Sequence, residues 1–227
     1  MSIIVFASSK GGAGKTTAAI ILASEFAQQA APKGKTITLI DADPNQHSAK
    51  WAFKSGCPLN IKVVENSNED SIIDDIDNAN QDSAFVIVDL EGTASMAVAS
   101  AISRADLVII LCQGSQDDAD EAIKTIKLIK RQEKLLARKI VYSVLFTRTH
   151  PVIRPRTLTY ITDEFKKLKI EMFHCSLIDR EAFRAMRSFG GTIENLDQNE
   201  VYSKDKAIAN IKAFTEEVKI KLLNLSR

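Results

Sequence analysis

The chain has 227 residues, of which 45% are hydrophobic and 26% are charged, values that are ordinary for a globular protein. They exclude a disordered or fibrous protein, and a chain of this length buries a full core without disulfides or structural metals. Thirty Lys and Arg residues against 29 Asp and Glu residues give a net charge of +1, so the total charge indicates no nucleic-acid partner. We expect a single domain that covers residues 1–227.

The three cysteines, Cys57, Cys112 and Cys175, are far apart in the sequence and form no CxxC pair. This pattern argues against a disulfide framework or a zinc site, and it favours a reducing, cytoplasmic compartment. Cys112 ends an apolar run, so we expect it in the core. The first nine residues lack the basic region of a secretory signal, and no apolar run is as long as a membrane span.

Short runs rich in Ile and Val alternate with longer amphipathic stretches along the whole chain. The runs show little polar alternation, which is typical of parallel strands that are covered on both faces. We therefore expect an α/β fold of three layers, with a mostly parallel sheet between helices. The predicted strands are residues 3–7, 36–40, 61–64, 85–88, 107–111 and 140–146. The predicted helices are residues 16–29, 46–54, 70–79, 95–103, 117–134, 157–168, 180–188 and 204–225.

A glycine-rich segment, residues 9–17, follows the first predicted strand and leads into the first predicted helix. Its glycines allow the backbone N–H groups to point inward at phosphate oxygens, and the helix adds its positive N-terminal end. Lys15 can reach the β- and γ-phosphates of a nucleotide, and the Thr16 hydroxyl can bind Mg²⁺. The strict P-loop pattern fails only at Ser9, where a glycine is expected. The predicted nucleotide-binding residues are Lys10, Gly11, Gly12, Ala13, Gly14, Lys15, Thr16 and Thr17.

Residues 10–16 resemble the deviant Walker A motif, K-G-G-x-G-K-[ST], of the ParA and MinD family of P-loop ATPases. The resemblance implies an Mg²⁺-dependent ATPase that forms a homodimer when ATP binds. It also implies that Lys10 crosses the dimer interface to the partner's phosphates, in the manner of an arginine finger. The alternative is that Lys10 is only a surface lysine beside an anionic ligand.

Carboxylates follow two of the predicted strands, at the edge where α/β sheets bind ligands. Asp41 and Asp43 resemble the family's second motif, D-x-D-P-Q. The resemblance assigns Asp43 to positioning the attacking water and Asp41 to the Mg²⁺ shell, although Asp43 could instead cap the helix that follows. Asp89 ends an apolar strand of Walker B form and is expected to contact Mg²⁺ through water. The next residues, 90–93, depart from the D-x-P-P pattern of many relatives and match the short ParA proteins of the ParF and VirC type.

One single arginine and one group of three arginines are further candidates, the first for binding adenine and the second for binding DNA. Arg148 follows the sixth predicted strand, where relatives place residues that contact adenine, although a surface salt bridge is an equal alternative. Arg180, Arg184 and Arg187 are spaced four and three apart, so they are expected on one helix face, which suits contact with DNA phosphates. A solvated or intramolecular face is the equal alternative. Residues 131–187 hold 13 basic and six acidic residues, whereas residues 65–91 hold nine acidic residues and no basic one.

The final predicted helix has one apolar stripe and a basic opposite side. MinD binds membrane through such a helix, but a single apolar stripe is also what any packed surface helix shows, so we expect packing on the sheet. The resemblance implies an ATPase that binds DNA without sequence preference on the bacterial nucleoid. It would partition plasmid or chromosome DNA and be stimulated by a ParB-like partner. The alternatives are a VirC-like role in conjugative DNA transfer, a MinD-like positioning ATPase on membrane, and an ATP-using enzyme resembling dethiobiotin synthetase.

Overall fold

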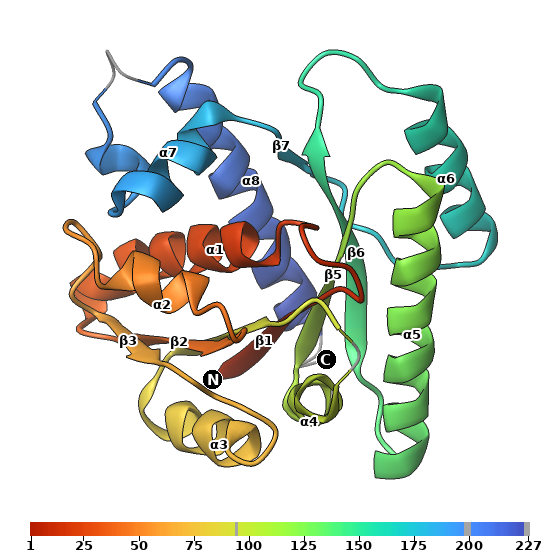
Figure 1. The fold of residues 1–227 in the computed structure, drawn as a ribbon, viewed down its shortest axis with the longest axis horizontal. Coiled ribbons are helices and arrows are strands. Elements are labelled where there is room, and N and C mark those ends of the chain that lie inside the picture. Colours follow the sequence, from red (N-terminus) through yellow and green to blue (C-terminus); the bar gives the residue numbers. More distant parts are fainter. Residues whose placement is uncertain (94, 198–200, 225–227) are drawn as a thin grey trace.

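A computed structural model describes residues 1–93, 95–197 and 201–224 of the chain. Within these residues, seven strands form a parallel sheet in the order β3-β2-β4-β1-β5-β6-β7 (Figure 1). The strands are β1 (Ser2–Ala7), β2 (Ile37–Ala42), β3 (Ile61–Val64), β4 (Phe85–Leu90), β5 (Leu107–Cys112), β6 (Val141–Thr149) and β7 (Leu177–Ile178).

Helices cover both faces of this sheet, which gives the three layers predicted from the sequence. One face carries α1 (Lys15–Ala30), α2 (His47–Ala52), α7 (Glu181–Phe189) and α8 (Lys204–Leu223). The other face carries α3 (Ile72–Asp82), α4 (Met96–Arg104), α5 (Gln116–Leu136) and α6 (Arg156–Lys167). Two 3-10 turns, Ala31–Lys33 and Ile193–Asn195, follow α1 and α7 respectively.

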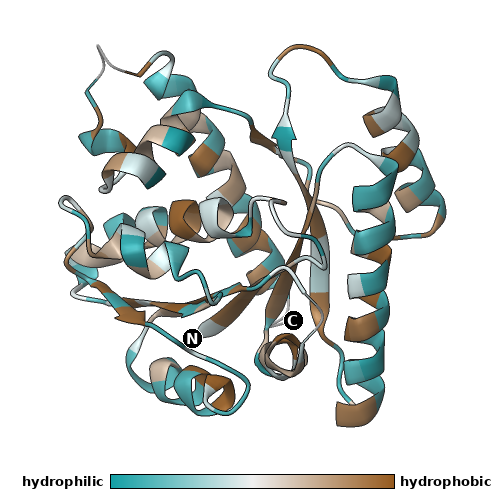
Figure 2. Ribbon diagram, in the orientation of Figure 1, coloured by the Kyte–Doolittle hydropathy of each residue, from teal (hydrophilic) through white to brown (hydrophobic). Residues whose placement is uncertain are grey.

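The strands are buried on both faces, so each one contributes to two hydrophobic cores. In β1, Ile4 and Phe6 pack with α1 and α8, whereas Ile3 and Val5 pack with α3 and α4 on the other side. Figure 2 shows the result as hydrophobic strands between helices whose outer surfaces are hydrophilic. This double burial explains why the strands appear in the sequence as nearly continuous apolar runs.

The α/β class and the six predicted strands are confirmed, and the differences lie at element ends and in one missed strand. Strand β7 has only two residues, which is too short for a periodic signal. Helix α2 is shorter than predicted: it begins at His47, after Gln46 has adopted a positive φ of 52°, and it ends at Ala52, two residues before the predicted end. Helix α3 begins at Ile72 and continues to Asp82, beyond the predicted end.

The final helix packs on the sheet, as the sequence analysis favoured. Its apolar side chains Phe214 and Val218 are fully buried, and Phe214 contacts the ring of Phe173 with centroids 5.6 Å apart. The predicted end of this helix, Leu225, lies outside the described residues. No helix of the described part of the chain is long and apolar enough to cross a membrane. Cys112 is fully buried in the core, as expected.

Candidate nucleotide-binding site

The glycine-rich segment forms a loop between β1 and α1 at the carboxyl edge of the sheet. Gly12 and Gly14 have positive φ angles of 79° and 97°, a region that side chains disfavour, and α1 begins directly after Gly14. The Lys15 Nζ atom folds back over the loop and donates a hydrogen bond to the carbonyl of Lys10 over 3.3 Å. This is the strand, loop and helix arrangement that a phosphate-binding motif requires.

Contacts from three neighbouring segments hold the loop in shape. The Thr147 hydroxyl at the end of β6 donates to the carbonyl of Ala13 over 2.8 Å, and the Gln113 amide donates to the carbonyl of Gly12 over 3.0 Å. Gly92, after β4, lies so close that a Cβ atom there would be 2.8 Å from the Cα and N atoms of Gly11. Only a glycine permits this approach, so the segment after β4 is in direct contact with the phosphate loop.

The serine at the first position of the loop also has a structural partner. The Ser9 hydroxyl lies 2.9 Å from the hydroxyl of Thr125 on α5. A side chain at this position therefore connects the loop to the neighbouring helix. The departure from the strict P-loop pattern leaves the remaining loop geometry in place.

The two lysines of the motif have different surroundings. Lys15 is buried, and burial lowers the pKa of its ammonium group, an effect that the nearby carboxylates of Asp89 and Asp43 oppose. Lys10 is half-exposed, and its Nζ atom pairs with a carboxylate oxygen of Asp118 at 3.0 Å. The hydrogen bond to Asp118 raises the pKa of Lys10. Lys15 thus faces inward to the loop, whereas Lys10 lies at its outer side against α5.

The predicted metal ligands come together beneath the loop. Asp41 and Asp89 are paired in register across β2 and β4, and both are fully buried. One oxygen of Asp89 accepts a hydrogen bond from the Ser48 hydroxyl over 2.6 Å, and the other is buried with no partner among the described residues. Burial raises the pKa of Asp89 to about 7. An unpaired, buried carboxylate oxygen of this kind fits a cation, so Asp89 and Thr16 are suited to hold Mg²⁺.

The carboxylates of Asp41 and Asp43 already accept hydrogen bonds from neighbouring N–H groups. The two oxygens of Asp41 accept the backbone N–H groups of Asp43 and Ala49, over 3.1 and 2.8 Å. Asp43 accepts the backbone and side-chain N–H groups of Asn45, so it closes a tight turn. The helix-cap alternative for Asp43 is wrong, because the residue at the N-cap of α2 is Gln46. A place for Asp41 in the metal shell stays a prediction.

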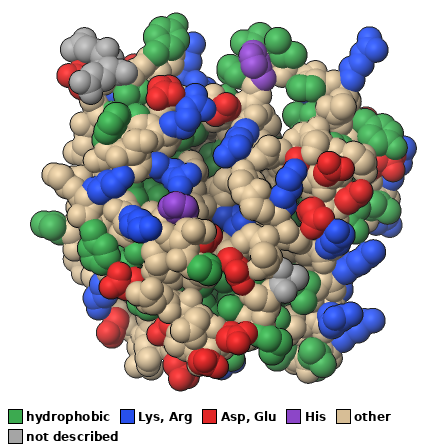
Figure 3. Space-filling model, in the orientation of Figure 1, with side chains coloured by type: hydrophobic (Ala, Val, Ile, Leu, Met, Phe, Trp, Pro, Cys, Tyr) green, Lys and Arg blue, Asp and Glu red, His purple; other side chains and the backbone are tan. Residues whose placement is uncertain are grey.

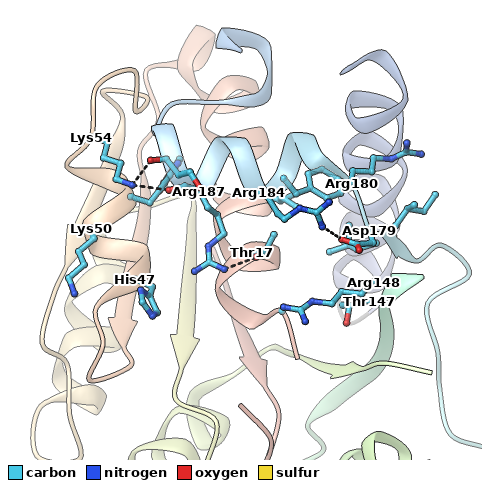
Figure 4. A pocket seen from close by; sticks show the side chains of 17 residues that line it. Thr17, His47, Lys50, Lys54, Thr147, Arg148, Asp179, Arg180, Arg184 and Arg187 are labelled. Atoms are coloured by element: carbon cyan, nitrogen blue, oxygen red, sulfur yellow. Dashed lines mark hydrogen bonds and ion pairs between the residues drawn. The ribbon is translucent and has the colours of Figure 1, made fainter. Parts of the chain in front are cut away.

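Two adjoining cavities open beside the loop. The smaller, of about 500 Å³, is lined by the loop residues together with Asp43, Glu91 and Gly92. The larger, of about 900 Å³, lies between the N-terminus of α1, the helices α2 and α7, and the ends of β6 and β7. Arg148 and Arg187 line both cavities, and Figure 4 shows their side chains approaching Thr17 from opposite sides. The loop therefore opens onto two adjoining cavities that share a basic lining.

The three arginines of the predicted DNA stripe all line the larger cavity, but they differ in their position on α7 and in their partners. Arg180 precedes the first residue of α7, so it is the cap and not part of the helix. Arg184 is exposed and pairs with Asp179 over 2.6 Å (Figure 4) and with Glu181 over 2.9 Å. Arg187 is half-buried and donates to the Thr17 hydroxyl over 3.2 Å. Helix α7 begins one residue later than predicted, and a DNA-contacting face shared by the three arginines stays a prediction.

Several residues of the site carried no signal that the sequence analysis used. Thr147 and Gln113 hold the loop through contacts between segments more than 100 residues apart. His47 and Lys50 of α2, and Lys54 just after that helix, line the larger cavity. Gly92 differs from these residues in having a local signal, because a glycine two residues after the Walker B strand indicates a close backbone approach.

The fold and the loop together define a P-loop nucleotide-binding protein of the ParA and MinD type. The family model described as VirC1 protein matches residues 1–223, so the chain belongs to the VirC1 protein family. Protein ParA of Rhizobium radiobacter is 37% identical over 227 residues, which cover 100% of both chains.

Two solved structures share the fold. Apo McdA from Cyanothece superposes with a TM-score of 0.77 at 16% identity, covering 96% of this chain and 99% of McdA. A Borrelia burgdorferi B31 protein that is assigned to plasmid partition, bound to AMPPNP, superposes with a TM-score of 0.64 at 18% identity. That match covers 95% of this chain and 99% of the Borrelia chain.

Proposed function

We propose that the protein is an Mg²⁺-dependent ATPase that dimerises when ATP binds, binds DNA without sequence preference, and partitions plasmid or chromosome DNA with a ParB-like partner. The observation that carries this proposal is the pair of lysines on one loop, Lys15 buried at its centre and Lys10 at its outer side. A single nucleotide site needs only Lys15. Two relatives support the same function: the Rhizobium radiobacter protein is named ParA, and the Borrelia protein is assigned to plasmid partition.

The loop would bind the ATP phosphates through its inward N–H groups, the N-terminal end of α1 and Lys15. Mg²⁺, held by Thr16 and Asp89, would neutralise charge that develops on the phosphates. Asp43 lies at the rim of the phosphate cavity and is only partly buried, so it can orient a water molecule toward the γ-phosphate. Arg148 would contact the adenine base from the end of β6.

Lys10 would complete the site of the partner subunit. Its side chain is half-exposed and flexible enough to leave Asp118, so it can extend across an interface to the partner's phosphates. The dimer would then present two copies of the basic region around α7, with Arg184 exposed at its centre. Doubling the phosphate contacts would raise the affinity for DNA through avidity and counterion release.

The alternatives differ in their support. A VirC-like role in conjugative DNA transfer is favoured by the family model itself and would use the same ATP switch. A MinD-like role on membrane would need a free apolar helix face, and the apolar stripe of α8 is buried in the core. Co-sedimentation with DNA and with liposomes, each with and without ATP, tests this choice, and binding to liposomes alone would reject the DNA proposal.

Size-exclusion chromatography with light scattering tests whether the protein dimerises when ATP binds. We expect a monomer with ADP and a dimer with AMPPNP. Lys15→Ala should weaken nucleotide binding at least about 10-fold, because it removes the charged phosphate donor. Lys10→Ala should bind nucleotide as a monomer. A Lys15→Ala protein that binds and hydrolyses ATP normally would overturn the proposed function.

A further inference from the structure

The last turn of α7 reaches the phosphate-binding end of α1. The guanidinium Nη1 atom of Arg187 donates to the Thr17 hydroxyl over 3.2 Å, and the side chain lines both cavities. Thr17 is the third residue of α1, in the turn whose free N–H groups face a bound phosphate. Arg187 therefore brings a positive charge to the inner part of the site, where the α-phosphate of a nucleotide would lie.

Contacts with α2 and the segment after it fix the backbone at this end of α7. The Lys54 Nζ atom donates to the carbonyls of Arg187 and Ser188, over 2.9 and 2.8 Å. The Trp51 indole donates to the carbonyl of Gly191 over 3.0 Å, and this contact is buried. The position of Arg187 is thus held by two side chains, which is what a preorganised ligand contact needs.

The charge of Arg187 is also uncompensated, unlike that of its neighbour. Arg184 has carboxylate partners in Asp179 and Glu181, whereas no ion pair among the described residues includes Arg187. The Thr17 oxygen accepts the Arg187 N–H group, which leaves the Thr17 proton free to be donated to a phosphate oxygen. One anionic group placed between them would satisfy both side chains.

We propose that Arg187 is a nucleotide-binding residue that contacts the α-phosphate within its own subunit, together with Thr17. This assignment rests on the proposed ATPase function. It removes Arg187 from the DNA-contacting set and leaves Arg184 as the exposed arginine of α7. It also links the nucleotide site directly to the helix that carries the proposed DNA surface.

Isothermal titration of the full chain with Mg-ADP and with Mg-AMPPNP tests the proposal. Arg187→Ala should raise the Kd about 10-fold or more for both nucleotides equally, because both contain an α-phosphate and one charge-assisted hydrogen bond is lost. Arg187→Lys should recover part of the affinity, because it keeps the charge without the fork geometry. Arg156→Ala, which removes an exposed arginine of α6, is the control and should stay within twofold of the wild type.

The double variant Arg187→Ala with Thr17→Val shows whether the two side chains act on one group. Their losses should be less than additive. A Kd for Arg187→Ala within twofold of the wild type would overturn the proposal, as would a loss confined to AMPPNP. Melting curves without nucleotide identify a folding defect, in which case Arg187→Lys gives the decisive comparison. If the wild type itself fails to bind nucleotide, the proposed ATPase function fails instead.

Discussion

Lys10 is the residue on which the proposed dimer depends, and in the single chain it is paired with Asp118. Asp118 is itself almost fully buried at the N-terminus of α5, where the side chain also accepts the hydroxyl of Ser115. For Lys10 to reach a partner's phosphates, this internal pair must break. The pair therefore favours the separated state and opposes dimerisation.

Replacing Asp118 by Asn should make ATP-dependent dimerisation easier. The amide keeps the shape and accepts the Ser115 hydrogen bond, but it no longer attracts the Lys10 ammonium group. Half-exposed ion pairs are weak, so we expect the dimer dissociation constant with AMPPNP to fall about 2- to 5-fold, measured by sedimentation equilibrium. Asp117→Asn is the control, because Asp117 lies in the same helical turn, is exposed, and forms no ion pair among the described residues. Unchanged or weaker dimerisation in Asp118→Asn would contradict this account of Lys10.

At the scale of elements, α7 packs against α1, α2 and α8, and α2 adds a buried hydrogen bond to the segment after α7. The short α2 places the Trp51 ring in the core between α1 and α7, and its indole N–H group reaches the Gly191 carbonyl after α7. Both atoms of this hydrogen bond are buried, so losing the donor leaves a carbonyl without a partner. The position of α7, and with it the shape of the larger cavity, therefore depends on this contact.

Trp51→Phe should lower the free energy of unfolding by roughly 1–3 kcal/mol. The smaller ring keeps most of the packing but removes the hydrogen bond and leaves a small void. Urea denaturation with an unchanged m-value measures the loss. Phe53→Ala is the control, since this aromatic side chain at the end of the same helix is exposed and should change stability by less than about 0.5 kcal/mol. Equal effects of the two changes would show that Trp51 does not anchor α7.

The elements also show what could be predicted from the sequence. Six strands were predictable because burial on both faces gives long apolar runs, and the phosphate loop was predictable because its residues are contiguous. Strand β7 was not predictable, since a strand of two residues shows no periodicity. The start of α2 was not predictable either, since the positive φ of Gln46 depends on its contacts. The partners Asp118, Thr147 and Arg187 were not predictable either, because they reach the loop from segments distant in the sequence.

At the scale of the whole molecule, the net charge of +1 conceals regions of opposite local charge. Acidic side chains gather over α3, and basic side chains gather over α2 and α7 (Figure 3). Helix α3 lies on one face of the sheet and α2 and α7 lie on the other, so the negative charge of α3 is separated from the basic region around α7.

The salt dependence of DNA binding tests this arrangement quantitatively. Each phosphate that a protein neutralises on duplex DNA contributes about −0.9 to the slope of log K against log[salt]. If each subunit of the dimer uses Arg184 on one phosphate, Arg184→Ala should make the slope with AMPPNP shallower by about 1.8. Arg104→Ala is the matched control, because Arg104 is also in an exposed ion pair but lies beside the acidic helix α3, where it contacts Asp77. We expect an unchanged slope for Arg104→Ala in fluorescence anisotropy with duplexes of unrelated sequence. Equal slopes for Arg184→Ala and the wild type would place the DNA surface elsewhere than α7.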